Sequence, residues 1–326
     1  MKKVPISIII DDPAPIISVF HSHHKTGFTK DGRPILEYVS NDFLKTFCDI
    51  VEKHGIKGKF SVVPMPGNKG DILNGLEGAD QTQVNEWLDM VKTRLVPHFS
   101  IGPEMLTHNK AVDLKTGDAL PLREDEWASS QDKTTLTPYI AHAVSILQKA
   151  GFDVSGLTSP WQMGIDVEEE YTAAISKAIF DVTNKKNAWF FLRGLWETPN
   201  AKPWVELEED GRCLVSIPAT TYDRIWQSID TTRTDDAFIS QVADILITKD
   251  GTSGEILQVL ETGGYPILIT HWQSLVSNGL GTGLQILDEI GKRINQHLSH
   301  RVEWMSAEEI MNLIIQNKTD YPKPKF

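Results

Sequence analysis

Five acidic or imidazole side chains stand close behind short apolar segments of this chain, where strands of a predicted parallel sheet would end. They are Asp11, Asp12, Glu104, His108 and His271. Carboxylate oxygens and imidazole nitrogens ligate divalent cations, and the same groups transfer protons at neutral pH. If the fold brings them together, they could form a metal site with a neighbouring acid/base pair, as metal-assisted hydrolysis requires.

Asp11 and Asp12 directly follow the β-branched run 6–10. Adjacent side chains at a strand end point in different directions, so one aspartate can ligate a cation while the other accepts a proton. Aspartates in such a place can instead cap a helix or a turn. Pro13 and Pro15 follow at once. They disfavour a regular helix at this point, so we favour the functional interpretation.

Glu104 and His108 are four residues apart and follow the apolar segment 98–101. If the chain turns helically here, both side chains face the same way and can share one cation. An incidental pair in a surface loop would have the same spacing. The position just beyond a predicted strand is what favours the metal interpretation.

Strand and helix patterns alternate along the chain, and these elements must position the five groups. The predicted strands are short apolar segments at 6–10, 60–63, 98–101, around 157, and at 189–192, 214–217, 267–270 and 302–304. The predicted helices are longer segments at 40–55, 82–95, 137–151, 167–180, 237–248, 284–298 and from 307 onward.

Repeated strand-then-helix units predict an α/β fold with a mostly parallel sheet. Seven or so strands without a glycine-rich phosphate loop favour a TIM-like (β/α) barrel, seven-stranded and irregular, over a dinucleotide-binding fold. Functional residues of such a barrel lie at the C-terminal ends of its strands. No segment has the composition of a linker, so we predict a single domain over 1–326.

The composition excludes several classes of partner. The chain has 326 residues, with 44 acidic and 32 basic side chains and a formal charge of −12. This balance argues against nucleic acid and anionic membranes, which need clustered Lys and Arg. No apolar run is long enough to span a membrane. Only Cys48 and Cys213 are present, too few for a disulfide framework. As given, the chain is expected to be cytoplasmic, or secreted or periplasmic if a leader was removed; its oligomeric state is left open.

In this order the motifs resemble the polysaccharide deacetylase family (carbohydrate esterase family 4, or NodB homology domain) of the glycoside hydrolase/deacetylase barrel superfamily. The matching motifs are a strand ending in two aspartates at 8–12, a glycine turn and strand at 55–63, an Ile-Gly turn leading to Glu104 and His108 at 101–108, Ser-Pro-Trp at 159–161, and a strand ending in His271 at 268–271.

The resemblance implies a role for each matched residue. Asp11 would be the general base and His271 the general acid, while Asp12 and His108 would be metal ligands. Glu104 stands where the family has its first metal histidine. The resemblance implies Zn²⁺, but two carboxylates and one imidazole would also suit Mn²⁺ or Mg²⁺.

Three further features concern the base, the substrate and the loop beside the site. The family's arginine before the Pro-aromatic motif is missing, since Thr158 and Ser159 stand there. Trp161 and Trp272, together with Trp226, could form apolar platforms for sugar rings, although a tryptophan more often packs in a core. Three histidines in the long segment after the first strand, at 21, 23 and 24, are expected to be exposed but could overhang the site.

Together these features predict a hydrolase that uses a divalent metal to remove acyl groups from an N-acylated sugar or related linear amide, with a carbohydrate or small acylated molecule as its partner. One alternative is a glycosidase of the same superfamily that needs no metal. It would require two acids about 5–10 Å apart, and Asp11 and Glu104 are the candidates. A second alternative is a catalytically inactive barrel that binds carbohydrate.

Overall fold

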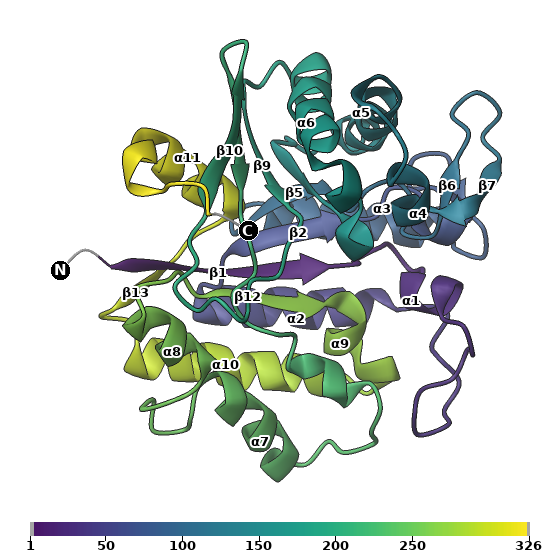
Figure 1. The fold of residues 1–326 in the computed structure, drawn as a ribbon. Coiled ribbons are helices and arrows are strands. Elements are labelled where there is room, and N and C mark those ends of the chain that lie inside the picture. The colour runs from purple at the N-terminus through teal and green to yellow at the C-terminus, as the bar shows by residue number, and fades with distance from the viewer. Residues whose placement is uncertain (1–2, 325–326) are drawn as a thin grey trace.

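A parallel sheet organises the half of the molecule that carries the two aspartates (Figure 1). The computed structural model describes residues 3–324. The strands of this sheet follow the order β12-β1-β2-β5, and β13 pairs with the start of β1. Their bounds are β1 Val4–Asp11, β2 Gly58–Val62, β5 Phe99–Pro103, β12 Ile267–His271 and β13 Val302–Trp304.

A second sheet has the order β10-β11-β9-β8, in which only β10 runs antiparallel to its neighbour. Its strands are β8 Gly156–Thr158, β9 Asn187–Phe191, β10 Trp204–Glu209 and β11 Arg212–Ser216. Two small ladders lie outside the sheets: β3 Gly70–Asp71 with β4 Gly75–Leu76, and β6 Lys110–Val112 with β7 Ala119–Arg123.

Helices pack around the sheets, with α5 against α6 and α10 against both α2 and α7 (Figure 1). The longer helices are α2 Asn41–His54, α3 Gln81–Met90, α5 Lys133–Lys149, α6 Glu168–Thr183, α7 Asp236–Leu246, α10 Thr282–His297 and α11 Ala307–Gln316. The shorter ones are α1 Val19–His23, α4 Glu124–Ala128, α8 Glu255–Glu261 and α9 Trp272–Val276. Among the helices of residues 3–324, none is long and apolar enough to cross a membrane.

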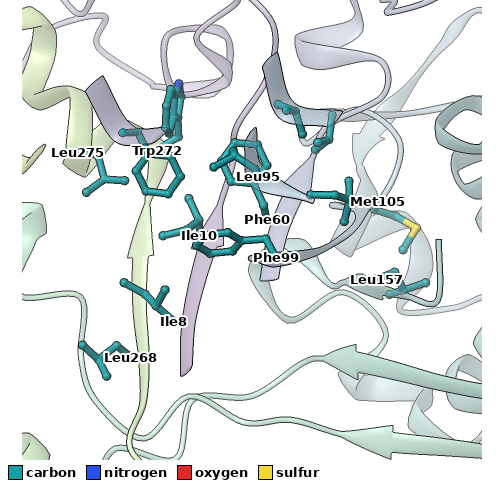
Figure 2. Packing of buried hydrophobic residues seen from close by; sticks show 14 of the residues in the cluster. Ile8, Ile10, Phe60, Leu95, Phe99, Met105, Leu157, Leu268, Trp272 and Leu275 are labelled. Carbon is teal, nitrogen blue, oxygen red and sulfur yellow. The ribbon is translucent and has the colours of Figure 1, made fainter. Parts of the chain in front are cut away.

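The core lies on both faces of β1, which explains why its sequence is continuously apolar rather than alternating. Ile8 and Ile10 pack on one face with Phe60 and Phe99 (Figure 2). Ile9 faces the other way, into a separate buried cluster with residues of the second sheet. Because both faces are buried, the end of β1 also lies inside the protein, and the aspartates that follow it are withdrawn from solvent.

The mixed α/β fold with a parallel sheet is confirmed, but the predicted barrel is not. Within residues 3–324 the strands form no closed sheet. Between β5 and β8 there is only an isolated bridge, Glu104–Thr158. Strands β11 and β12 form no ladder. Instead, the N–H of Thr220, beyond the end of β11, donates to the Ile267 carbonyl of β12 at 2.8 Å.

Strand β10, which the sequence analysis missed, explains why β11 does not pair with β12. It forms a hairpin with β11 and therefore occupies the edge of β11 that a closed barrel would offer to β12. The sequence does contain a signal for this hairpin, since Asp-Gly at 210–211 is a typical two-residue turn. In the structure both residues have positive φ (51° and 72°), as such a turn requires.

Candidate metal centre and active site

The register of β1 and β12 places the predicted base beside the predicted acid. Asp11 is paired with His271 at the last position of the parallel ladder. Asp12 then leaves the strand with φ 69°, in the left-handed region, so the two aspartates diverge. Both are nearly inaccessible, at 3% and 2% exposure. The two strand ends therefore hold Asp11 and His271 at one edge of the sheet.

Asp12, Glu104 and His108 converge as the sequence predicted. One potential ligand atom from each lies within 4.8 Å of the others, and all three residues are buried. His108 Nε2 lies 2.8 Å from Asp12 Oδ1 and 3.4 Å from Glu104 Oε1. The second Glu104 oxygen accepts a hydrogen bond from the Asp12 backbone N–H at 2.5 Å.

This donor set fits a divalent cation. Within residues 3–324, Asp12 Oδ1 is buried and accepts no hydrogen bond, so it is left facing His108 Nε2 at 2.8 Å. Burial and the charges of Asp11 and Asp12 raise the pKa of Glu104 to about 8. Burial opposes ionisation of Asp12 as well, but the adjacent His108 holds its pKa well below the usual range. A bound cation would favour the ionised carboxylates and take the place of such protons.

The segment between the two ligands is a loop, not the helical turn we expected. Met105 and His108 both have positive φ, at 40° and 49°. The side chain of Glu124, at the start of α4 and fully buried, accepts hydrogen bonds from the backbone N–H groups of Leu106 and Thr107 at 3.0 Å and of His108 at 2.8 Å. A buried carboxylate thus fixes the backbone that carries His108. No sequence motif marked it, because it lies 16 residues beyond His108.

A second residue that the sequence analysis missed is Lys59, on β2. Its Nζ lies 2.5 Å from Asp11 Oδ1 and 2.6 Å from Ser61 Oγ, and it also contacts Thr158 Oγ1. The lysine side chain is 3% exposed and the aspartate side chain 4% exposed. Lys59 therefore supplies a buried cation to the predicted base from a neighbouring strand, at the place where Thr158 stands instead of an arginine.

His271 is held by Asp223, which the sequence analysis also missed. Asp223 Oδ2 lies 2.8 Å from His271 Nδ1 and accepts hydrogen bonds from the His271 N–H at 3.1 Å and from Ser274 Oγ at 2.7 Å. Burial disfavours the imidazolium, but the hydrogen bond to Asp223 and the negative charges of Asp12, Asp223 and Asp11 together outweigh burial, and the pKa of His271 rises to about 9. Because Nδ1 is committed to Asp223, Nε2 is the ring nitrogen left for a substrate.

A crystal structure of a protein from Mycobacterium smegmatis, provisionally assigned as a polysaccharide deacetylase, superposes on this chain with a TM-score of 0.53. The match covers 87% of this chain and 82% of that one, at 12% sequence identity. The chain has a polysaccharide deacetylase-like fold. No protein-family model matches the sequence, and neither does any curated protein.

In this deacetylase-like fold the predicted base, acid and ligands line one cavity of about 440 Å³. A larger cavity of about 680 Å³ between α2, α7 and α10 contains none of them. The aromatic side chains that line the smaller cavity are Trp161, Phe191, Trp196, Tyr222 and Trp226. A pocket of this size, with aromatic walls and a cluster of acidic and imidazole side chains, is typical of small-ligand sites.

The predicted tryptophans are placed differently. Trp161 lines the cavity, and its ring lies 4.2 Å from that of His108. Trp272 is 3% exposed and does not line it. Its ring instead makes edge contacts with Phe47 and Phe60 at 5.7 and 5.9 Å. Figure 2 shows Trp272 among the buried residues of the core. Trp272 belongs to the core because α9 turns inward directly after His271.

Proposed function

We propose that this protein is a metal-dependent hydrolase that removes an acyl group from the nitrogen of an N-acylated sugar or a related linear amide. The observation that carries the proposal is the buried group of Asp12, Glu104 and His108 in one cavity with Asp11 and His271. The deacetylase-like fold supports it. We further propose one domain over 1–326, since Lys59 and Thr158, from different sheets, meet at Asp11.

Asp12, Glu104 and His108 would hold the cation. When bound, a divalent cation supplies Lewis-acid polarisation of the amide carbonyl and lowers the pKa of a bound water. By family resemblance Zn²⁺ is the first candidate, and the two carboxylates also suit Mn²⁺ or Mg²⁺. The side-chain amide of Gln273 donates to Asp12 Oδ2, which orients the carboxylate so that Oδ1 faces His108.

Asp11 would accept the proton of the attacking water. Lys59 and Ser61 both contact Oδ1, so we assign Oδ2 as the proton acceptor. A buried carboxylate is costly to ionise without a partner, and Lys59 provides that partner while leaving the second oxygen available. The pair thus fixes Asp11 through Oδ1 and leaves Oδ2 free to accept a proton.

His271 would protonate the departing amine from Nε2. Asp223 fixes its tautomer and stabilises the imidazolium, so the proton is present before the C–N bond breaks. Base and acid come from paired strand ends, and an amide in the cavity would lie between them. The products are a free amine and a carboxylic acid.

An acetate-release assay on N-acetylglucosamine oligomers tests the proposal. We expect release by protein loaded with Zn²⁺, Co²⁺ or Mn²⁺, loss after chelation, and recovery when metal is restored. Asp11→Asn is the matched variant, expected to bind metal but release no acetate. Cleavage of glycosidic bonds that persists in chelator would overturn the proposal in favour of a glycosidase, and metal binding without acetate release from any N-acylated sugar would overturn the catalytic assignment.

The ligand set also predicts a metal preference. Two carboxylates neutralise a divalent cation more fully than one carboxylate and two imidazoles, so the site should tolerate harder ions such as Mn²⁺ or Mg²⁺ better than a histidine-rich site would. Glu104→His should shift the ranking of affinities towards Zn²⁺ and Co²⁺. Competition titration of wild type and variant at one fixed pH measures this ranking. An unchanged ranking would mean that Glu104 is not a ligand.

A further inference from the structure

Glu124 contacts the loop that carries His108 with both of its carboxylate oxygens. Oε1 accepts hydrogen bonds from the backbone N–H groups of Leu106 and Thr107, both at 3.0 Å, and from the Tyr139 hydroxyl at 2.7 Å. Oε2 accepts the backbone N–H of His108 at 2.8 Å. Glu124 is fully buried, where hydrogen bonds are electrostatically stronger than in water. Oε2 is therefore the oxygen that holds the backbone of His108.

The backbone at His108 needs support of this kind. Its φ is 49°, in the left-handed region, which is unfavourable for a residue with a Cβ and persists only where the surroundings enforce it. In this conformation Nε2 of His108 lies 2.8 Å from Asp12 Oδ1 and 3.4 Å from Glu104 Oε1. The hydrogen bond from Glu124 thus acts on the conformation that brings the three proposed ligands together.

The ring of His108 lacks the support that metal-binding histidines commonly have. Such a histidine almost always donates its second ring nitrogen to a carboxylate, a carbonyl or a water, and that hydrogen bond fixes the ring. Within residues 3–324, Nδ1 of His108 is buried and has no hydrogen-bond partner. The ring packs against Trp161 instead, with centroids 4.2 Å apart. Its orientation therefore depends on packing and on the backbone, and the backbone is where the Glu124 carboxylate binds.

The hairpin of β6 and β7 brings Glu124 back to this loop. Lys110, just after the loop, pairs with Arg123, and the Glu124 N–H donates to the Asn109 carbonyl at 2.9 Å. Arg123 also lies over Trp161, with its guanidinium carbon 4.6 Å from the ring centroid. Two adjacent residues of one hairpin thus contact both supports of the ligand, the neighbour of its ring and its backbone.

We propose that Glu124 is a positioning residue of the metal centre, which raises the affinity for the cation by holding the backbone of His108 in the conformation that ligation requires. The inference rests on the proposed function and adds to it, because it assigns a role in metal binding to a side chain that lies outside the proposed ligand group. Outer partners of metal ligands typically contribute about 10–100-fold to metal affinity.

Glu124→Gln tests the contact with His108 selectively. An amide has one acceptor oxygen, and we expect it at the Oε1 position, where three donors meet. The amide nitrogen then faces the His108 N–H, so that hydrogen bond alone is lost. Affinity for Zn²⁺, measured by competition titration at one fixed pH, should fall about 10–100-fold. Tyr139→Phe is the matched control. It removes a hydrogen bond from the same carboxylate but leaves the three from the backbone, and it should bind Zn²⁺ as wild type does.

Glu124→Asp separates the effect of position from that of charge. It keeps the carboxylate but is shorter by one methylene, so it cannot reach the three backbone N–H groups together. We expect its affinity for Zn²⁺ to fall as that of Glu124→Gln does. Wild-type affinity in Glu124→Asp would mean that the carboxylate acts on the cation through its charge, and would overturn the inference.

Unfolding with and without Zn²⁺ distinguishes positioning from stabilisation of the fold. A cation that binds the folded protein stabilises it according to its affinity. The gain in unfolding free energy on adding saturating Zn²⁺ should therefore be smaller in Glu124→Gln, by about 1.4 kcal/mol for each tenfold loss of affinity. A residue that only stabilised the fold would lower the unfolding free energy equally with and without Zn²⁺, and an unchanged gain would overturn the inference.

Two further outcomes separate this inference from the proposed function. If wild type binds Zn²⁺ and Glu124→Gln binds it equally well, or if Glu124→Gln and Tyr139→Phe lose affinity equally, the inference is refuted and the metal centre stands. If wild type binds none of Zn²⁺, Co²⁺ and Mn²⁺, the metal centre itself is refuted, and the proposed function and this inference fail together.

Discussion

His271→Ala is expected to lower kcat by about 10²–10⁴ while the protein keeps its metal. The leaving amine must be protonated as the C–N bond breaks, and His271 Nε2 is the proposed donor. His271 does not belong to the group of Asp12, Glu104 and His108, so its removal leaves the ligands in place. Steady-state kinetics together with elemental analysis of the purified variant measures both parts of this result.

The pH profile gives the same prediction a second readout. An acid works only when protonated, and the pKa of His271 lies at about 9, so activity should fall as the pH rises through that region. Asp223→Asn removes the carboxylate that stabilises the imidazolium. The pKa of His271 should then drop, and the alkaline fall in kcat/KM should begin at a lower pH.

Two results would contradict this role. If His271→Ala lost its metal along with its activity, His271 would be a ligand or would support one. If Asp223→Asn lowered activity equally at every pH, Asp223 would act on the fold rather than on the proton of His271.

The sequence predicted those site residues whose positions depend on the local geometry of the chain. Asp11 and Asp12 follow a buried strand, and His271 ends another, so strand-end reasoning placed all three at one edge of the sheet. Glu104 and His108 were also predicted, although their convergence depends on a loop rather than the expected helical turn. Each of these positions can be recognised from the residues that adjoin it in the sequence.

The residues that support the site could not be predicted in this way. Lys59 lies inside β2, and the residues next to it do not indicate that it has an acidic partner. That partner, Asp11, is 48 residues away in the sequence. Asp223 lies six residues beyond the predicted strand 214–217, too far to be recognised as its end, and 48 residues before His271. Such contacts between distant parts of the chain exist only once the fold has formed. A single sequence therefore does not reveal which residue Lys59 or Asp223 will contact.

The fold shows the same division. The alternation of strands and helices predicted the parallel sheet, because it depends on local patterns of apolar residues. Closure into a barrel depends on which strand occupies which edge. The hairpin of β10 and β11 occupies the edge of β11, and this antiparallel element is not part of the strand-then-helix pattern.

The other large effect is expected at Lys59. Lys59→Met leaves Asp11 buried without its cation, and breaking a buried ion pair in this way costs about 3–5 kcal/mol of unfolding free energy. Turnover should fall as well, because Asp11 loses the contact that fixes its carboxylate through Oδ1. Chemical denaturation of the metal-loaded protein and acetate release measure the two effects.

Lys57 offers a matched control two residues earlier. It pairs with Glu309 at 2.7 Å, but the two side chains are 31% and 46% exposed, so Lys57→Met should cost at most about 1 kcal/mol. The double variant Asp11→Asn/Lys59→Met removes both buried charges, and we expect it to be more stable than Lys59→Met alone, since no charge is then left unpaired. Two results would contradict this prediction. Lys59→Met could be no more destabilising than Lys57→Met, or the double variant could be less stable than Lys59→Met; in either case the buried pair would not be what stabilises Asp11 in the fold.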